Sequence, residues 1–176
     1  MREPEPETLR AATRGDKDAF EELVRQFLPA VHRLAWHFVR DASAAEDVTQ
    51  DTFLSAYRAI GRFRLDDKFS TWLFRIARNR SIDALRRRRP ALELFATNAP
   101  AAPVDDPDTR AWLRAAIDSL PRELRETFLL VEVLGFSYPE TSKVMGVPTG
   151  TVKSRMHRAR RALVADLTAE ERADEM

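Results

Sequence analysis

A proline-rich segment near the middle of the chain limits how its 176 residues can fold. Between Pro90 and Pro107 the sequence reads PALELFATNAPAAPVDDP, which holds four prolines and no helical period. Such a segment is typical of a linker between folded parts. Fully extended, its 18 residues would span about 60 Å. The segment therefore predicts two small domains that can contact separate places.

Composition favours helices on both sides of this linker. Glycine is scarce, with 5 residues, and alternating strand patterns are hard to find. A hydrophobic content of 44% is sufficient to build cores. We therefore expect an all-α protein with two small helical domains, residues 16–90 and 109–167, joined by a flexible linker, residues 91–108. Residues 1–15 are expected to form a disordered acidic terminus and residues 168–176 an acidic tail.

Helix boundaries can be predicted in the first half. The sequence SAAE, beginning at Ser43, fits a capping box and predicts a helix that continues to about Ile60. Ser70 is suited to cap a further helix, which Pro90 would end. Upstream, AFEELVRQFL and AVHRLAWHFV have helical spacing on either side of Pro29. Four helices are therefore expected in a compact bundle.

The second half ends in a helix-turn-helix pattern. Pro121 suits the first turn of a helix that Gly135 would end. The sequence SYPE, beginning at Ser137, fits another capping box and opens a short helix that Gly146 ends. Thr149 is then suited to cap a longer basic helix. A short helix, a Gly-containing turn and a longer basic helix together form a helix-turn-helix.

The net charge of +1 conceals segments of opposite charge. Residues 75–89 hold seven Arg against one Asp, whereas residues 164–176 hold five acidic residues against one Arg. Basic stripes favour polyanions. The chain has no Cys, which excludes disulfides and thiolate metal sites. The first residues lack an apolar signal segment, so we expect a cytoplasmic protein with no membrane insertion.

The last predicted helix has an apolar stripe and a basic face. On a helical wheel, Val152, Met156, Ala159 and Leu163 form the core-facing side. The opposite side and its flanks carry Lys153, Ser154, Arg155, His157, Arg158, Arg160 and Arg161. These side chains can donate to guanine acceptors or phosphates. A merely solvated face is the alternative, but the position behind a short helix and turn favours duplex DNA recognition.

The helix predicted after Ser70 has an unusual outer face. Its buried side comprises Leu73, Phe74, Ala77, Ser81, Ala84 and Leu85. Its outer side comprises Trp72, Arg75, Ile76, Asn79, Asp83, Arg86 and Arg87. Aromatic rings stack unpaired bases, Asn and Asp bond base edges, and Arg neutralises phosphate. Two alternatives stay open: Trp72 packs beneath the Phe63–Phe69 loop as core, and the Arg run is a solvated helix end.

A third face lies on the helix after Ser43. Asp47, Asp51, Leu54 and Arg58 recur at spacings of four, three and four residues. An apolar centre between charged residues is typical of a helix-on-helix protein interface, although single exposed apolar residues are common. A metal site at Asp47 and Asp51 is the weaker interpretation, because the sequence places no clear third or fourth ligand.

Three stretches of the sequence together resemble the extracytoplasmic-function group of bacterial sigma factors. They are AEDVTQDTFLSAYRAIGRF, FSTWLFRIARNRSIDALRRRR and LPRELRETFLLVEVLGFSYPETSKVMGVPTGTVKSRMHRARRAL. The resemblance covers residues 18–89 and 113–167, and the linker has no room for the extra domain of larger sigma factors. It implies a protein that performs no chemistry, holds no metal or other cofactor, and lends promoter specificity and strand opening to RNA polymerase.

The resemblance also implies a partner for each face. The β′ clamp helices of core RNA polymerase are implied for Asp47, Gln50, Asp51, Leu54 and Arg58, with Phe53 of the same family pattern expected in the core. The opened minus-ten element is implied for Lys68, Trp72, Arg75, Ile76, Asn79, Asp83, Arg86 and Arg87. The minus-thirty-five duplex is implied for Lys153, Ser154, Arg155, His157, Arg158 and Arg161. The β flap of the polymerase and an anti-sigma factor are further implied partners.

Two sites depart from the family pattern. Leu65, Asp66 and Asp67 replace a Gly-containing turn next to the minus-ten face, so the shape of this turn is not predicted. Thr141 and Ser142 replace an apolar residue and Ala, which is expected to loosen helix packing.

Two other functions fit parts of the sequence. An autonomous DNA-binding regulator would use the last helix but leaves Asp47, Leu54 and Arg58 without a role. A metal-dependent nuclease would use Asp47 and Asp51 and would require a divalent ion. The sigma-factor hypothesis agrees with all three faces.

Overall fold

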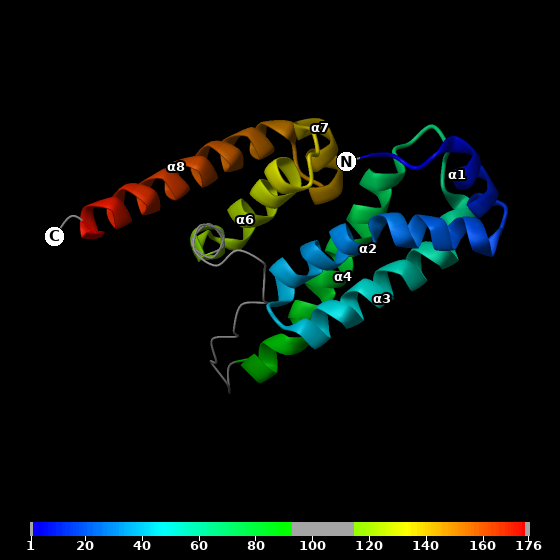
Figure 1. Ribbon diagram of the computed structural model, residues 1–176, viewed down its shortest axis with the longest axis horizontal. Coiled ribbons are helices and arrows are strands. Elements are labelled where there is room, and N and C mark those ends of the chain that lie inside the picture. The colour runs from blue at the N-terminus through cyan, green and yellow to red at the C-terminus, as the bar shows by residue number, and fades with distance from the viewer. Residues whose placement is uncertain (1, 93–114, 175–176) are drawn as a thin grey trace. The chain divides into compact units, whose positions relative to one another are not determined.

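A computed structural model describes residues 2–92 and 115–174 of the chain (Figure 1). All regular secondary structure within these residues is helical. The chain divides into two compact units close to residue 100. The first unit contains α1 (Pro6–Thr13), α2 (Lys17–Val39), α3 (Ala42–Ala59), η1 (Ile60–Arg62) and α4 (Phe69–Leu92). The second contains a helical segment at residues 115–119, α6 (Arg122–Phe128), η2 (Leu129–Val133), α7 (Tyr138–Met145) and α8 (Thr149–Asp174). The predicted all-α fold is confirmed, and most of the predicted linker lies outside the described residues.

The three long helices of the first unit, α2, α3 and α4, pack side by side (Figure 1). The α4 side chains predicted to be buried include Leu73, Phe74 and Ala77, and all three are fully buried. Phe27 of α2 meets Phe69 of α4 edge to face, with ring centroids 5.3 Å apart. Burying a large apolar side chain stabilises a fold by about 1.5–3 kcal/mol. This shared core fixes the faces that α3 and α4 turn outward.

The N-terminal half of this unit differs from the prediction in two ways. Residues 1–15, predicted to be a disordered acidic terminus, contain helix α1, which buries Leu9 and Ala12. The two helices predicted around Pro29 form one continuous helix, α2. A proline inside a helix costs roughly 3 kcal/mol, and the buried apolar stripe of α2 continues on both sides of Pro29 and offsets this cost.

Helix ends in the first unit also differ from the prediction. Asp41 caps α3 instead of Ser43, and its side chain accepts a hydrogen bond from the backbone N–H of Ala44 at 2.8 Å. Both residue types are good caps, so local sequence does not distinguish them. Helix α4 begins one residue before Ser70, the predicted cap, and it continues past Pro90 by two residues.

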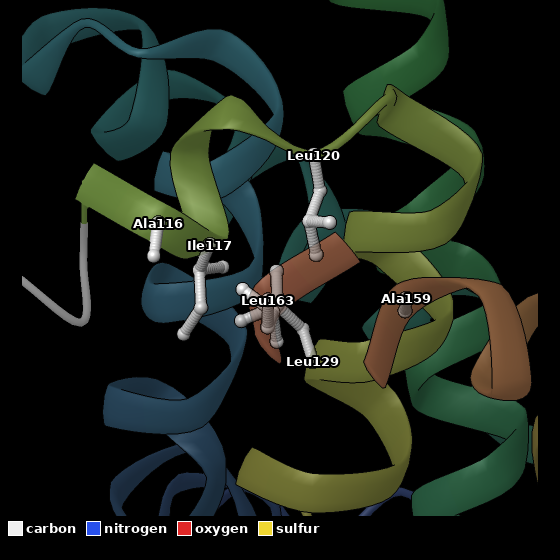
Figure 2. Close-up of a cluster of buried hydrophobic side chains, with 6 residues drawn as sticks. All are labelled: Ala116, Ile117, Leu120, Leu129, Ala159 and Leu163. Atoms are coloured by element: carbon white, nitrogen blue, oxygen red, sulfur yellow. The ribbon is translucent and has the colours of Figure 1, made fainter. Parts of the chain in front are cut away.

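One cluster of the second unit's core consists of six buried apolar side chains. Figure 2 shows them converging: Ala116, Ile117, Leu120, Leu129, Ala159 and Leu163. They come from the segment before α6, from η2 and from α8, so this core joins α8 to the start of the unit. The predicted core-facing stripe of α8 is confirmed, since its four residues are at most 8% exposed.

Helices α7 and α8 form the predicted helix-turn-helix. A capping box at Ser137 starts α7, as predicted. Gly146 ends α7 with a φ of 68°, a left-handed conformation that favours glycine. Thr149 is the first residue of α8 instead of its cap, because the N–H of Val152 already bonds the carbonyl of Pro148 at 3.2 Å.

Helix α8 extends further than the predicted domain. Its backbone is helical as far as Asp174, which includes most of the segment predicted as an acidic tail. In the part of the chain that the structure describes, no helix has both the length and the apolar character needed to cross a membrane.

Candidate nucleic-acid and protein interfaces

The outward side of α8 carries most of the residues predicted to contact duplex DNA. The exposed ones are Lys153, Ser154, His157, Arg158 and Arg161. They lie opposite the buried stripe because an α-helix repeats every 3.6 residues. Most of them lie in the first half of a helix that follows a short helix and a turn, the part of a recognition helix that contacts base edges.

Two further arginines of α8 form ion pairs within the second unit. Arg155 Nη2 lies 2.5 Å from Glu123 Oε2 of α6, and the Arg155 side chain is only 12% exposed. Arg160 Nη2 lies 2.6 Å from Glu132 Oε1 of η2. The hydrogen bond to Glu132 raises the pKa of Arg160 above its ordinary value. Arg155, predicted as a DNA contact, therefore links α8 to α6, unlike the exposed residues around it.

Helix α4 and the residue before it carry a polar surface around one half-buried aromatic ring. The exposed members of the predicted face are Lys68, Arg75, Asn79, Arg86 and Arg87, and the half-buried ones are Trp72, Ile76 and Asp83. The Trp72 ring centroid lies 5.2 Å from that of Phe63 and 5.6 Å from that of Phe69. The Trp72 side chain therefore packs on the Phe63–Phe69 loop, as one alternative predicted, but it remains partly accessible.

A turn closed by an ion pair precedes α4. Arg64 donates from Nε and Nη2 to the two carboxylate oxygens of Asp66, at 3.2 and 2.8 Å. The N–H of Asp67 bonds the Arg64 carbonyl at 3.0 Å, which closes a four-residue turn. The hydrogen bond from Arg64 lowers the pKa of the Asp66 carboxyl. The carboxylate therefore keeps its charge at a lower pH than an ordinary Asp side chain. Leu65 lies in this turn and is 52% exposed.

An apolar groove of about 770 Å³ lies between α2 and α3. Its lining residues are Phe20, Val24, Leu28, Pro29 and His32 of α2 and Glu46, Thr49, Gln50, Phe53, Leu54 and Tyr57 of α3. Leu28, Leu54 and Tyr57 are exposed over 45%, 46% and 43% of their surface. Large apolar side chains exposed together in one groove indicate a surface for a protein partner.

The predicted polymerase contacts divide between this groove and a second hollow. Gln50 and Leu54 line the α2–α3 groove. Asp47 and Asp51 line a hollow of about 430 Å³ that α3 shares with α4. Arg58 is also exposed on α3 but lines neither of them. Within residues 2–92 and 115–174, no cluster of three or more His, Cys, Asp or Glu side chains was found that could hold a metal ion.

The α2 wall of the groove was not predicted from the sequence. Phe20, Val24 and Leu28 follow one another at four-residue intervals and so share one side of α2. Tyr57, also missed, packs edge to face on Phe20 with ring centroids 5.0 Å apart. A second apolar stripe on α2, beside the buried one, was the sequence signal that could have predicted this wall. Only the packing of α3 against α2 shows which apolar residues line the groove and which lie in the core.

Comparison with known families assigns a class to this fold. The model of sigma-70 region 2 matches residues 23–91, and the model of sigma-70 region 4 matches residues 110–163. The first match includes most of the α2–α3 groove and nearly all of α4, and the second includes the helix-turn-helix. Together they define a transcription initiation factor of the sigma-70 class.

Relatives that align over most of their length place the chain in a more specific group of sigma factors. The RNA polymerase sigma-H factor of Pseudomonas aeruginosa is 38% identical, and the alignment covers 92% of each chain. The ECF RNA polymerase sigma factor SigW of Bacillus subtilis is 31% identical, covering 88% of this chain and 92% of its own. This chain belongs to the extracytoplasmic-function group of RNA polymerase sigma factors, which confirms the predicted family. Its function is therefore in transcription initiation, through core RNA polymerase and promoter DNA.

Two solved structures have the same fold. CnrH, in complex with the cytosolic domain of CnrY, has a TM-score of 0.72 and 32% identity, covering 93% of this chain and 97% of its own. The sigma factor RpoE of Bartonella quintana, in complex with the anti-sigma factor NepR, has a TM-score of 0.75 and 28% identity, covering 85% and 96%.

Proposed function

We propose that the second unit recognises the minus-thirty-five element of a promoter as duplex DNA. The observation that carries this proposal is the exposed basic face of α8, which follows a capped short helix and a left-handed glycine turn. Lys153, Ser154, His157 and Arg158 would enter the major groove, where Arg and Lys donate to guanine and to phosphate. Arg155 would support this face through Glu123 instead of contacting DNA.

The first unit would bind the opened minus-ten element through α4 and the turn before it. Arg75, Arg86 and Arg87 would neutralise phosphates, and Trp72 and Asn79 would hold unpaired bases. Strand opening is favoured when extruded bases gain a binding place that compensates for lost stacking. The chain would perform no bond chemistry of its own, because the polymerase supplies catalysis.

The α2–α3 groove would bind core RNA polymerase through the clamp helices of β′, with the second unit contacting the β flap. The apolar groove with Gln50 in its lining, and the neighbouring hollow lined by Asp47 and Asp51, together have the composition of a protein interface with an apolar centre and polar surroundings. Among the solved neighbours, CnrH is in complex with the cytosolic domain of CnrY, and RpoE is in complex with the anti-sigma factor NepR. An anti-sigma factor that covers these faces is therefore part of the proposal, as is a cytoplasmic location, where polymerase and promoter meet.

Promoter selection with core polymerase tests this function. The purified chain and bacterial core polymerase would be incubated with a randomised duplex library, and opened DNA would be detected by permanganate reactivity of unpaired thymines. We expect enrichment of two separate elements with opening at the downstream one. Core polymerase alone and the chain alone are the controls. Failure to open any promoter would reject the sigma-factor role, and selection of the same DNA by the chain alone would favour an autonomous regulator.

A further inference from the structure

The N-terminal arm, residues 2–5, lies outside the matched family region at residues 23–91, but it is attached to that region by hydrogen bonds. The backbone carbonyl of Arg2 accepts a hydrogen bond from Gln26 Nε2 of α2 at 3.1 Å. Pro4 is buried. Glu3 accepts hydrogen bonds from both the backbone N–H of Ser70, at 3.3 Å, and the Ser70 hydroxyl. The arm therefore joins α2 to the first turn of α4.

This contact supplies a cap that α4 lacks locally. The N–H of Trp72 bonds the carbonyl of Lys68 at 3.1 Å, which places Lys68 at the N-cap position. A lysine side chain only donates hydrogen bonds, so it cannot satisfy the free N–H groups of the first turn. The Glu3 carboxylate accepts from one of them and places negative charge at the helix N-terminus, where it is favourable.

The turn that Glu3 holds also carries the aromatic residue of the minus-ten face. Trp72 follows Ser70 by two residues, and its ring packs on Phe63 and Phe69. Ser70 is only 2% exposed, so the arm fixes the turn from its inner side and leaves the outer side accessible. A change in this turn would move Trp72 directly.

We propose that Glu3 is a positioning residue for promoter opening, which fixes the first turn of α4 and thereby the orientation of Trp72 toward the opened strand. This inference rests on the proposed function of α4. The arm would then contribute to the function of the first unit, although Glu3 lies 67 residues before Ser70 in the sequence.

The test compares Glu3→Ala with Glu3→Gln, which keeps one acceptor oxygen, and with Glu7→Ala, an exposed glutamate of α1. Each full-length variant would be assembled with core polymerase. Opening of a promoter selected by the wild-type protein would be followed by 2-aminopurine fluorescence. Affinities for a forked DNA with a single-stranded minus-ten element and for a minus-thirty-five duplex would be measured in parallel.

We expect Glu3→Ala to slow opening and weaken forked-DNA binding about fivefold, the effect of a typical lost cap. Polymerase assembly and minus-thirty-five binding should be unchanged, Glu3→Gln should recover part of the loss, and Glu7→Ala should resemble wild type. Ser70→Ala should add little to Glu3→Ala, because the Ser70 hydroxyl has already lost its partner when Glu3 is replaced. A non-additive loss, confined to promoter opening and forked-DNA binding, would support a positioning role.

Trp72→Ala separates this inference from the function on which it rests. If Trp72→Ala opens the promoter slowly while Glu3→Ala opens it at the wild-type rate, the positioning role is wrong and the function of α4 stands. Equal loss of assembly, duplex binding and opening in Glu3→Ala would show a general structural role and also overturn the inference. Normal opening by Trp72→Ala would overturn the assignment of α4 and this inference with it.

Discussion

Thr141 and Ser142 are adjacent polar residues of α7, and their hydroxyl groups have opposite effects on the stability of the fold. The Thr141 hydroxyl is buried and has no hydrogen-bond partner among the residues that the structure describes. The Ser142 hydroxyl donates to the carbonyl of Val147 at 2.5 Å and so ties α7 to the turn that follows it. The sequence predicted looser packing at both positions, but only Thr141 carries an evident cost. A buried polar group without a partner costs about 1–3 kcal/mol.

Replacing Thr141 by Val should stabilise the protein. Val has nearly the same shape and removes the unpaired hydroxyl, so we expect the free energy of unfolding to rise by about 1 kcal/mol. Urea unfolding followed by circular dichroism measures this change. Thr127→Val is the matched control, because the equally buried Thr127 hydroxyl donates to the Glu123 carbonyl at 2.7 Å. A loss of stability in Thr141→Val would contradict the prediction.

Arg158 and Arg155 should respond differently to substitution by Ala. Arg158 is exposed, so Arg158→Ala should leave unfolding unchanged and weaken discrimination of the minus-thirty-five sequence by about 1–3 kcal/mol. Arg155→Ala should instead lower the melting temperature, because it removes the pair with Glu123. Holoenzyme affinities for selected and scrambled duplexes, together with thermal unfolding, measure both effects. Equal weakening on all sequences would show that Arg158 contacts phosphate instead of a base.

The α2–α3 groove should lose its partner when charge is placed at its centre. Leu54→Asp introduces a carboxylate among apolar groove residues, and loss of a central interface side chain costs about 2–4 kcal/mol of binding. We therefore expect binding to fluorescently labelled core polymerase to weaken at least about thirtyfold. The helical circular dichroism signal should not change, because Leu54 is 46% exposed.

Ala42→Asp provides a matched control for this substitution. Ala42 is an exposed residue at the start of the same helix, and it lines neither the groove nor the second hollow. The same charge at this position should leave polymerase binding unchanged. Comparable weakening by both variants would mean that charge on α3, and not the groove, determines binding.

Helix faces were more predictable than helix ends. The buried stripe of α8 and the buried residues Leu73, Phe74 and Ala77 of α4 follow from the helical period alone. The ends depend on competition between nearby caps, as at Asp41 and Ser43, and on contacts from distant segments. Asp41 accepts the capping bond although Ser43 and Glu46 match a capping box in sequence.

The linker should determine how far apart the two promoter elements are. Doubling its length with Gly-Ser residues increases the entropy lost on joint binding, at a cost of about 0.6 kcal/mol or threefold in affinity. We expect selection to return the same two element sequences with a wider range of spacings. A linker of unchanged length but with Gly-Ser composition is the control. Unchanged strict spacing in the longer variant would show that the linker does not determine element separation.

By itself, the sequence determined the two-part helical architecture, the helix-turn-helix and the outward faces of α3, α4 and α8. These depend on local rules, namely a period of 3.6 residues, caps and turn residues. Only the tertiary structure decided which distant side chains meet: Glu3 with Ser70, Arg155 with Glu123, and the α2 wall with Leu54. Such pairs depend on how whole helices pack, because packing selects one neighbour among many side chains of suitable chemistry. For that reason the contacts that hold the faces in position were visible only in the folded protein.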